Sequence, residues 1–377
     1  MKRRALIMVL LMFGVASLIP AIGRAAEQKV IKIGVIGPLS GDSAWGGQYQ
    51  LNGARLKAEE LNATGSDIQI EIISEDDASK PDQSLAAAKK LIARDKIHAL
   101  LGAWNSTCTL AILPITAAEG VPQLTTSIAG PITQQGSKWI FRTNAHTSVL
   151  NYQTLEYVVR EMGLKKIAIF TSNEEVGKSA RVTAENALQK LGLKPVAKEE
   201  WSVGDKDFTG QLGRIQASGA DGLFFTIGFK EMAIIARQVR QLGMKVQLVG
   251  GDTLPGNKKF LELAGPDVVG MTFSILFLPV EDHPRVGPFV RNYQKRFNQV
   301  PDGHSAQFYD AVGVIHAAVK GTGVVDREKI RDYIRGLKKG TGYKGIMGDQ
   351  WWDEKGETML QLMIGRVIPG EKWEILR

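Results

Sequence analysis

Short apolar segments alternate with stretches of helical spacing along most of the chain. The apolar segments are rich in β-branched residues and bounded by Gly, Asp or Ser, which is typical of buried strands. They are Val30–Ile36, Ile68–Ser74, Ile97–Gly102, Lys166–Thr171, Gly222–Ile227, Val246–Gly250 and Val269–Ile275. Helices are predicted between them, at Gln48–Leu61, Gln83–Ala93, Ser148–Glu161, Ser179–Leu191, Phe208–Ala217 and Lys230–Leu242. This alternation predicts an α/β fold with parallel sheets that carry helices on both faces.

The pattern becomes mainly helical after residue 271. Helices are predicted at Arg285–Asn298, Ser305–Lys320 and Arg327–Leu337, and a late strand at Thr358–Val367. The length of 377 residues suits two lobes rather than one small core. No Pro- or Ser-rich linker divides the chain, which indicates that it passes between the lobes more than once.

The first 25 residues have the layout of a secretory signal peptide. A basic start is followed by the apolar run Ala5–Ile19 and by small residues that end at Ala25, where cleavage is expected. The alternative is a membrane anchor, but the run is shorter than the ~20 residues that a spanning helix needs. We therefore expect export to the periplasm, with no membrane insertion after the signal is removed.

The single cysteine, Cys108, excludes an internal disulfide and lies far from the cleavage site. A lipid anchor would need a Cys at the new N-terminus, where Ala26 stands. After removal of the signal, 43 basic and 39 acidic residues remain, a net charge of +4, and no long basic block indicates nucleic-acid binding. A freely diffusing periplasmic protein is the expected form.

Ligands bind parallel sheets at the carboxyl ends of the strands, where helix N-termini point. Ser106 follows the predicted strand Ile97–Gly102 at the start of a helix, where free N–H groups favour a ligand carboxylate. Ser106 could equally cap its own helix. The hydroxyl-rich loop Thr125–Pro131 follows the short apolar run Val121–Leu124 and offers backbone groups to a small molecule, or is simply a turn.

Two further strand ends carry candidate residues. Asp252 follows Val246–Gly250, where its carboxylate could meet a ligand ammonium or cap the helix near Asn257. Trp45 follows the first strand and could form a pocket wall or pack on the lobe surface.

Motifs for catalysis, metals or cofactors are weak. The G-x-G-x-x-G pattern at Gly340–Gly345 follows a helix rather than a strand, so it lacks the setting of a dinucleotide site. The five histidines show no metal-ligand spacing, and Cys108 has no evident catalytic partner. We expect no enzymatic activity, no metal and no cofactor.

Taken in order, several segments resemble the periplasmic branched-chain amino-acid-binding family, the leucine/isoleucine/valine type of ABC-transporter receptor. They are Ile33–Gly41, Glu75–Ser79, Gly204–Phe208, Tyr309–Val312 and Trp352–Gly356. The resemblance implies a type I periplasmic-binding-protein fold, with two doubly wound parallel-sheet lobes joined by three hinge crossovers. It implies a first lobe of residues 26–143 and 275–345, and a second lobe of residues 144–274 and 346–377.

The resemblance also implies a ligand site. Ser106 would hold the ligand α-carboxylate, Ser127 and Ala129 would contact the carboxylate and ammonium, and Asp252 would bind the ammonium. Trp45 matches a pocket aromatic, and Phe229 lies near a family Tyr.

This chain departs from the family pattern at several of these positions. Ala129 replaces a Thr, Val176 replaces a pocket Tyr, and Asp252 replaces the usual Glu. Ser79 and Asn105 stand where many relatives have a disulfide.

These features predict a monomeric receptor that closes on an amino-acid-like ligand and delivers it to an inner-membrane ABC permease. Another carboxylate, such as an aromatic acid or an amide, is an alternative ligand. An exported α/β hydrolase, a receptor sensing domain and a sugar-binding relative are less well supported, because none has its expected residues here.

Overall fold

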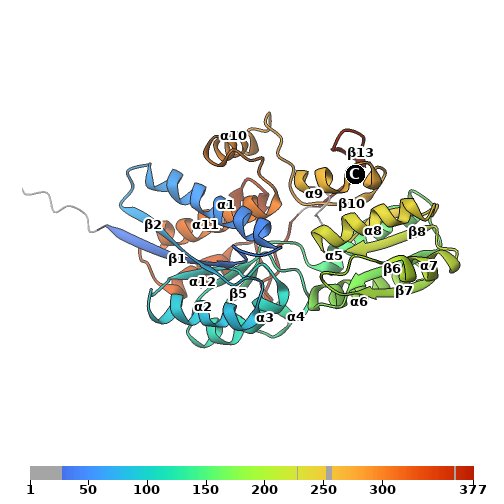
Figure 1. Ribbon diagram of the computed structural model, residues 1–377. Coiled ribbons are helices and arrows are strands. Elements are labelled where there is room, and N and C mark those ends of the chain that lie inside the picture. Colours follow the sequence, from blue (N-terminus) through green and yellow to red (C-terminus); the bar gives the residue numbers. More distant parts are fainter. Residues whose placement is uncertain (1–27, 227, 252–256, 361) are drawn as a thin grey trace, which may run out of the picture.

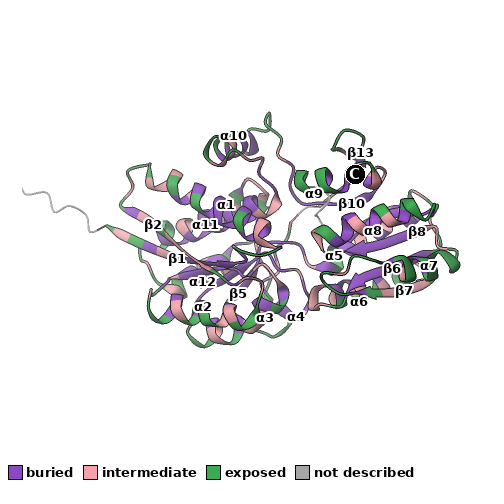
Figure 2. Cartoon of the chain, viewed as in Figure 1, coloured by how far each residue is buried: buried purple, intermediate pink, exposed green. Residues whose placement is uncertain are grey.

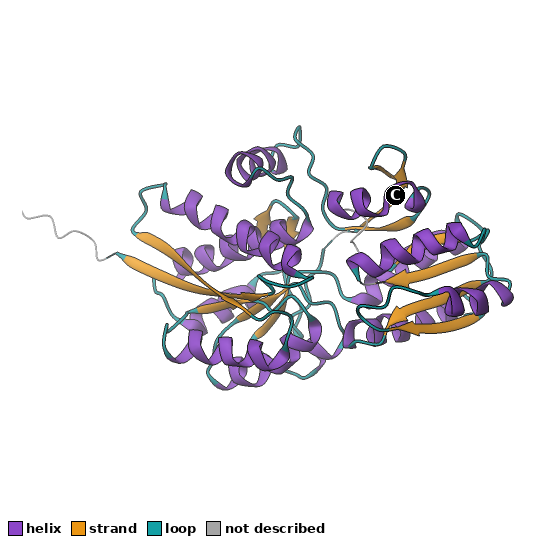
Figure 3. Cartoon of the chain, in the orientation of Figure 1, coloured by secondary structure: helices purple, strands orange, loops and turns teal. Residues whose placement is uncertain are grey.

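The computed structural model describes residues 28–226, 228–251, 257–360 and 362–377 (Figure 1). The predicted signal peptide and Asp252 lie outside the described residues. Two lobes lie side by side, each a sheet with helices on both faces, which confirms the predicted fold class (Figure 3).

The first lobe is built on five parallel strands in the order β2-β1-β3-β4-β5. They are β1 (Lys29–Gly37), β2 (Ile68–Asp76), β3 (Ala99–Leu101), β4 (Gln123–Thr125) and β5 (Ile140–Arg142). The covering helices are α1 (Ala44–Asn62), α2 (Pro81–Ala93), α3 (Ser106–Ala118), α4 (Pro131–Gln134), α10 (Val286–Phe297), α11 (Gly303–Thr322) and α12 (Arg327–Gly336). Successive residues of β1 from Ile33 onward are buried (Figure 2), as expected for a parallel sheet between two helical layers.

The second lobe contains seven strands in the order β14-β13-β10-β9-β8-β6-β7. They are β6 (Ile167–Ser172), β7 (Ala197–Trp201), β8 (Gly222–Thr226), β9 (Gln247–Gly250), β10 (Thr272–Ile275), β13 (Met363–Ile368) and β14 (Lys372–Ile375). The helices are α5 (Thr147–Arg160), α6 (Glu175–Lys190), α7 (Thr209–Ala217), α8 (Phe229–Gln241) and α9 (Lys258–Ala264). Its five parallel strands repeat the first lobe's order, because β7, β6, β8, β9 and β10 stand where β2, β1, β3, β4 and β5 stand there.

The chain passes between the lobes three times. It leaves the first lobe after β5, returns after β10, and enters the second lobe again before β13, which pairs antiparallel with β10. A two-stranded hairpin, β11 (Tyr343–Gly345) with β12 (Gly348–Gln350), precedes the last passage.

The turn of this hairpin and the residues just after it are held by the first lobe. Asp310 on α11 accepts a hydrogen bond from the Ile346 amide at 3.0 Å, and the Trp352 indole donates to the Arg142 carbonyl at 2.6 Å. The sequence placed the return to the second lobe at residue 346. These contacts lead us to propose that the return begins after Thr358 instead.

No helix within the described ranges is long and apolar enough to cross a membrane.

Candidate ligand cavity between the lobes

A cavity of about 290 Å³ lies between the two lobes. Most of its walls are formed by residues that follow the carboxyl ends of strands, where parallel sheets bind ligands. The first lobe contributes Asp42, Ser43, Trp45, Ser79, Trp104, Asn105, Ser106, Thr126, Ser127, Ile128, Asn144 and His304. The second lobe contributes Glu174, Val176, Val203, Gly228, Phe229, Lys230 and Glu231. The cavity is close in size to the smaller ligand sites of proteins.

Ser106 is the first residue of α3 and is 4% exposed at the cavity wall. Asn105 occupies the N-cap position, yet its side chain makes no capping hydrogen bond. The Ser106 hydroxyl instead accepts a hydrogen bond from the Ala129 amide at 3.4 Å. The first N–H groups of a helix have no partner within it, so the start of α3 presents donors and partial positive charge to the cavity.

Ser127 and Ala129 belong to the loop between β4 and α4. Ser127 lines the cavity, and its hydroxyl donates to the Trp104 carbonyl at 2.9 Å, which fixes the loop against the segment before α3. Ala129 is fully buried behind the lining and touches the site through Ser106.

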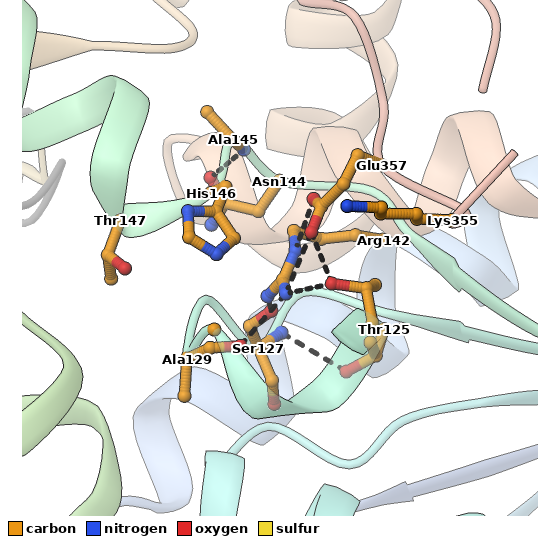
Figure 4. Close-up of polar contacts among 12 residues, drawn as sticks. Thr125, Ser127, Ala129, Arg142, Asn144, Ala145, His146, Thr147, Lys355 and Glu357 are labelled. Atoms are coloured by element: carbon orange, nitrogen blue, oxygen red, sulfur yellow. Dashed lines mark hydrogen bonds and ion pairs between the residues drawn. The ribbon is translucent and has the colours of Figure 1, made fainter. Parts of the chain in front are cut away.

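A buried ion pair holds this loop in place (Figure 4). Arg142, at the end of β5, has no exposed side-chain surface and donates to Glu357 at 2.8 Å. Its remaining N–H groups donate to the carbonyl oxygens of Ser127 and Ala129, the second at 2.9 Å. Burial acts to raise the pKa of Glu357, but the charge and hydrogen bonds of Arg142 hold it below its ordinary value. The guanidinium therefore fixes the backbone of one cavity wall.

Aromatic side chains from both lobes meet at the cavity. Trp45 lies 4.5 Å from Phe229 across the lobes, measured between ring centroids. Trp104 and His304 lie 5.4 and 5.5 Å from Trp45. The aromatic group places an apolar, polarisable surface beside the polar start of α3.

Gly228 precedes Phe229 and sets the beginning of α8. Its φ of 111° lies in the region that favours glycine, and an added Cβ would fall 2.7 Å from Glu231 Oε2 and collide with the Trp201 ring. A larger residue there would displace the α8 start that carries Phe229.

Two carboxylates, Glu174 and Glu231, face the cavity from the second lobe. Glu231 is 8% exposed and accepts a hydrogen bond from the Gly204 amide at 2.9 Å. Burial, together with the negative charge of Glu231, raises the pKa of Glu174. Lys230 also lines the cavity, but its ammonium pairs with Asp42 of the first lobe at 2.6 Å.

The lobes touch at further points around the cavity. The Asn257 amide donates to the Asp302 carboxylate at 2.7 Å, and both residues are buried. The Gly130 amide donates to the Ser179 hydroxyl at 3.0 Å. These contacts and the Lys230–Asp42 pair show that the two lobes are in direct contact in this structure.

Of the residues expected at the site, Trp45, Ser106, Ser127 and Phe229 line the cavity together, and Val176 lines it as well. Ala129 stands behind the wall.

Sequence reasoning missed Glu174, Glu231, Lys230, Trp104, Asn144, His304 and the Arg142–Glu357 pair. Glu174 follows a predicted strand, so the rule that led to Ser106 could have found it. Within the described parts of the chain, no group of three or more His, Cys, Asp or Glu side chains is placed to hold a metal ion.

Two lobes with repeated sheet order and a cavity at their facing strand ends define a two-lobed solute-binding protein. Residues 30–372 match the family described as periplasmic binding protein, and the chain belongs to that family.

The chain is similar to the leucine-, isoleucine-, valine-, threonine- and alanine-binding protein of Pseudomonas aeruginosa. The two are 28% identical over 331 residues, which cover 87% of each chain. Its structure resembles that of a leucine binding protein from Thermotoga maritima, with a TM-score of 0.82 and 25% identity over 92% of this chain and 98% of the other.

The fold also resembles a solute-binding protein of an ABC transporter from Rhodopseudomonas palustris, solved in complex with 3,4-dihydroxybenzoic acid. That likeness has a TM-score of 0.81 and 23% identity, covering 90% of this chain and 93% of the other.

Proposed function

We propose that this chain is the periplasmic receptor of an ABC importer and that it binds an amino-acid-like carboxylate between its lobes. The observation that carries the proposal is a cavity with the N-terminus of α3 on one wall and the carboxylates Glu174 and Glu231 on the other. A helix N-terminus favours an anion, and carboxylates favour a cation. A ligand with both charges contacts both lobes.

Contact with both lobes gives the ligand a higher affinity for the closed form than for the open form. This difference is what drives closure about the three crossovers. The closed form would then dock on an inner-membrane permease. We further propose export through the signal at residues 1–25, a freely diffusing monomer without a lipid anchor, and binding without chemical change, as the names of the relatives describe.

An aromatic acid is the second candidate ligand. The aromatic group of Trp45, Trp104, Phe229 and His304 favours it, because a ring could stack there while its carboxylate meets α3. The Rhodopseudomonas palustris protein is described in complex with such an acid.

A thermal-shift screen of the mature chain against amino acids, aromatic acids and short carboxylates tests the proposal. A ligand that binds the folded form increases the free energy of unfolding by RT ln(1 + [L]/Kd), and this increase raises the melting temperature. Calorimetry on each positive compound, repeated with Ser106→Ala, should show weaker binding of carboxylates. The proposal fails if no compound of any class shifts the melting temperature.

The role predicted for Asp252 separates the two ligand classes. Asp252→Ala is expected to weaken an amine-bearing ligand by at least ~2 kcal/mol, because a charged hydrogen-bond partner is lost. The affinity for 4-hydroxybenzoate, which has no amine, should stay unchanged. Unaltered affinity for the amine-bearing ligand, measured by calorimetry, would refute that role.

A further inference from the structure

We infer that the ligand carries a cationic side group besides its α-ammonium, and that Glu174 and Glu231 bind this group. The inference rests on the proposed function and goes further by naming the substrate class, a basic or guanidino amino acid.

Among the described lining residues, the ionisable side chains leave an excess of negative charge. Lys230 and Asp42 neutralise each other in an ion pair of 2.6 Å. Glu174 and Glu231 have no ion-pair partner anywhere in the described ranges, although both line the cavity. His304 is the remaining ionisable residue, and it lies against the Asp302 carboxylate at 3.1 Å. The second-lobe wall therefore offers two carboxylates to the space between the lobes.

Other buried acids of this chain are satisfied by the protein itself. Asp310 accepts hydrogen bonds from the amides of Ile346 and Met347 and from the Gln350 side chain, and Glu357 pairs with Arg142. The Glu174 side chain, by contrast, makes no hydrogen bond to any described residue, although it is half-buried. A carboxylate without a partner is costly in a desolvated site.

The opposite wall supplies an independent observation. Asn105 and Ser79 line the cavity, and their Oδ1 and Oγ atoms are buried with no hydrogen-bond partner among the described residues. An amide oxygen can only accept, so Asn105 Oδ1 lacks a donor. Ammonium and guanidinium groups carry three and five N–H donors and accept nothing, so either group suits a wall that carries two carboxylates.

The aromatic wall is compatible with the same group. Trp45 and Phe229 meet across the lobes at 4.5 Å, and a cation near such rings is attracted to their π faces. A neutral aliphatic side chain in this place would leave the two carboxylates desolvated and unpaired. The cavity therefore discriminates by charge more than by shape.

Matched ligand pairs test the inference on the mature chain. Arginine is compared with citrulline, and lysine with norleucine, because each neutral partner keeps the length and the α-amino-acid end. We expect the cationic member to bind at least about tenfold more tightly by calorimetry at pH 7.5, as charged hydrogen bonds require. Equal or tighter binding of both neutral members would overturn the inference.

Variants assign the effect to the two carboxylates. Glu174→Gln and Glu231→Gln should each weaken the cationic ligand about tenfold or more, and should weaken the neutral partner, which keeps only the α-ammonium, by much less. Glu175→Gln is the matched control, because Glu175 is adjacent on α6 but does not line the cavity. Melting temperatures without ligand verify that each variant is folded. Unchanged binding of arginine and lysine in both folded variants would contradict the assignment.

The same experiment separates failure of this inference from failure of the proposed function. If leucine or 4-hydroxybenzoate binds and no cationic amino acid does, the receptor function stands and the cationic class is wrong. If no compound binds, the receptor function fails and the inference fails with it.

Discussion

The Arg142 guanidinium lies fully inside the first lobe, beside the loop that forms one wall of the cavity. A charge can be buried in this way only with a partner and satisfied hydrogen bonds, and Glu357 with the loop carbonyls provides both. The two residues are 215 positions apart in the sequence, so no local pattern could have connected them.

Arg142→Met tests this arrangement. Removing one partner leaves the mostly buried Glu357 carboxylate with the Thr133 hydroxyl but without its ion-pair partner, so the free energy of unfolding should fall by roughly 3 kcal/mol in urea titrations. Arg142→Lys keeps the charge but loses the planar fork that reaches two carbonyls, so it should restore part of the stability. Ligand affinity should fall in both variants, because the loop loses its anchor. Wild-type stability in Arg142→Met would contradict this account.

The residues of the cavity could be predicted from the sequence where they follow a strand end directly. Trp45, Ser106, Ser127 and Phe229 all meet that condition and line the cavity. His304 does not, because it lies at the start of α11 and reaches the cavity only through the tertiary fold.

At the scale of elements, the hairpin β11–β12 is attached to the first lobe through Asp310. This carboxylate accepts from two backbone amides of the turn and from Gln350. Burial raises the pKa of Asp310 to about 6, although the hydrogen bonds from Met347 and Ile346 act to lower it.

The raised pKa predicts a pH dependence of stability. The folded state holds the Asp310 proton more tightly than the unfolded chain, whose carboxyl titrates near the ordinary value of about 3.9. The protonated Asp310 carboxyl therefore contributes fully to stability below the unfolded-state pKa, and this contribution is lost as the pH rises through the folded-state pKa of about 6.

Asp310→Asn does not titrate and isolates the effect. The quantity to compare is the unfolding free energy of the variant minus that of wild type. This difference should rise by roughly 2 kcal/mol from pH 4 to pH 7, in addition to any loss from the amide that does not depend on pH. Urea titrations at several pH values measure the difference. A difference that does not change with pH would rule out Asp310 as the titrating group.

A comparison of the predicted and observed strands shows that buried apolar runs were recognised in the sequence and that an edge strand was not. The first seven predicted strands are all present, and their ends agree within three residues. The strand β7, with sequence AKEEW, gave no apolar run because it lies at the edge of its sheet and alternates between half-buried and exposed positions before the buried Trp201. Its pairing with β6 is a tertiary contact that local pattern cannot supply.

The predicted late strand Thr358–Val367 begins too early. Thr358 forms an isolated bridge with Trp352 in the first lobe, and β13 starts only at Met363. An apolar stretch that spans a crossover looks continuous in sequence, although its two ends belong to different lobes.

At the scale of the whole molecule, the Asn257–Asp302 hydrogen bond joins two helix N-caps across the lobes. Asn257 caps α9 and Asp302 caps α11, and their side chains meet at 2.7 Å. Each residue therefore serves its own lobe and the contact between lobes.

Asn257→Asp should separate these two roles. An aspartate caps a helix as well as asparagine does, but it would place a second carboxylate against Asp302. We expect lower ligand affinity by about tenfold and a larger radius of gyration in small-angle scattering without ligand, because repulsion favours the open form.

Asn257→Ser is the control, since serine keeps the cap without adding charge. It should lie between wild type and Asn257→Asp in affinity. Identical scattering and affinity in all three proteins would show that this contact does not influence closure.

The path of the chain has one more consequence, since β1 lies in the first lobe and β14 in the second (Figure 1). Fluorophores attached before β1 and after β14 would be carried by different lobes, far from the residues that line the cavity. Rotation of one body against the other changes the separation of the two dyes, so energy transfer would report occupancy with no label in the binding space. The connectivity that joins the halves thus makes this protein a ready scaffold for a genetically encoded sensor.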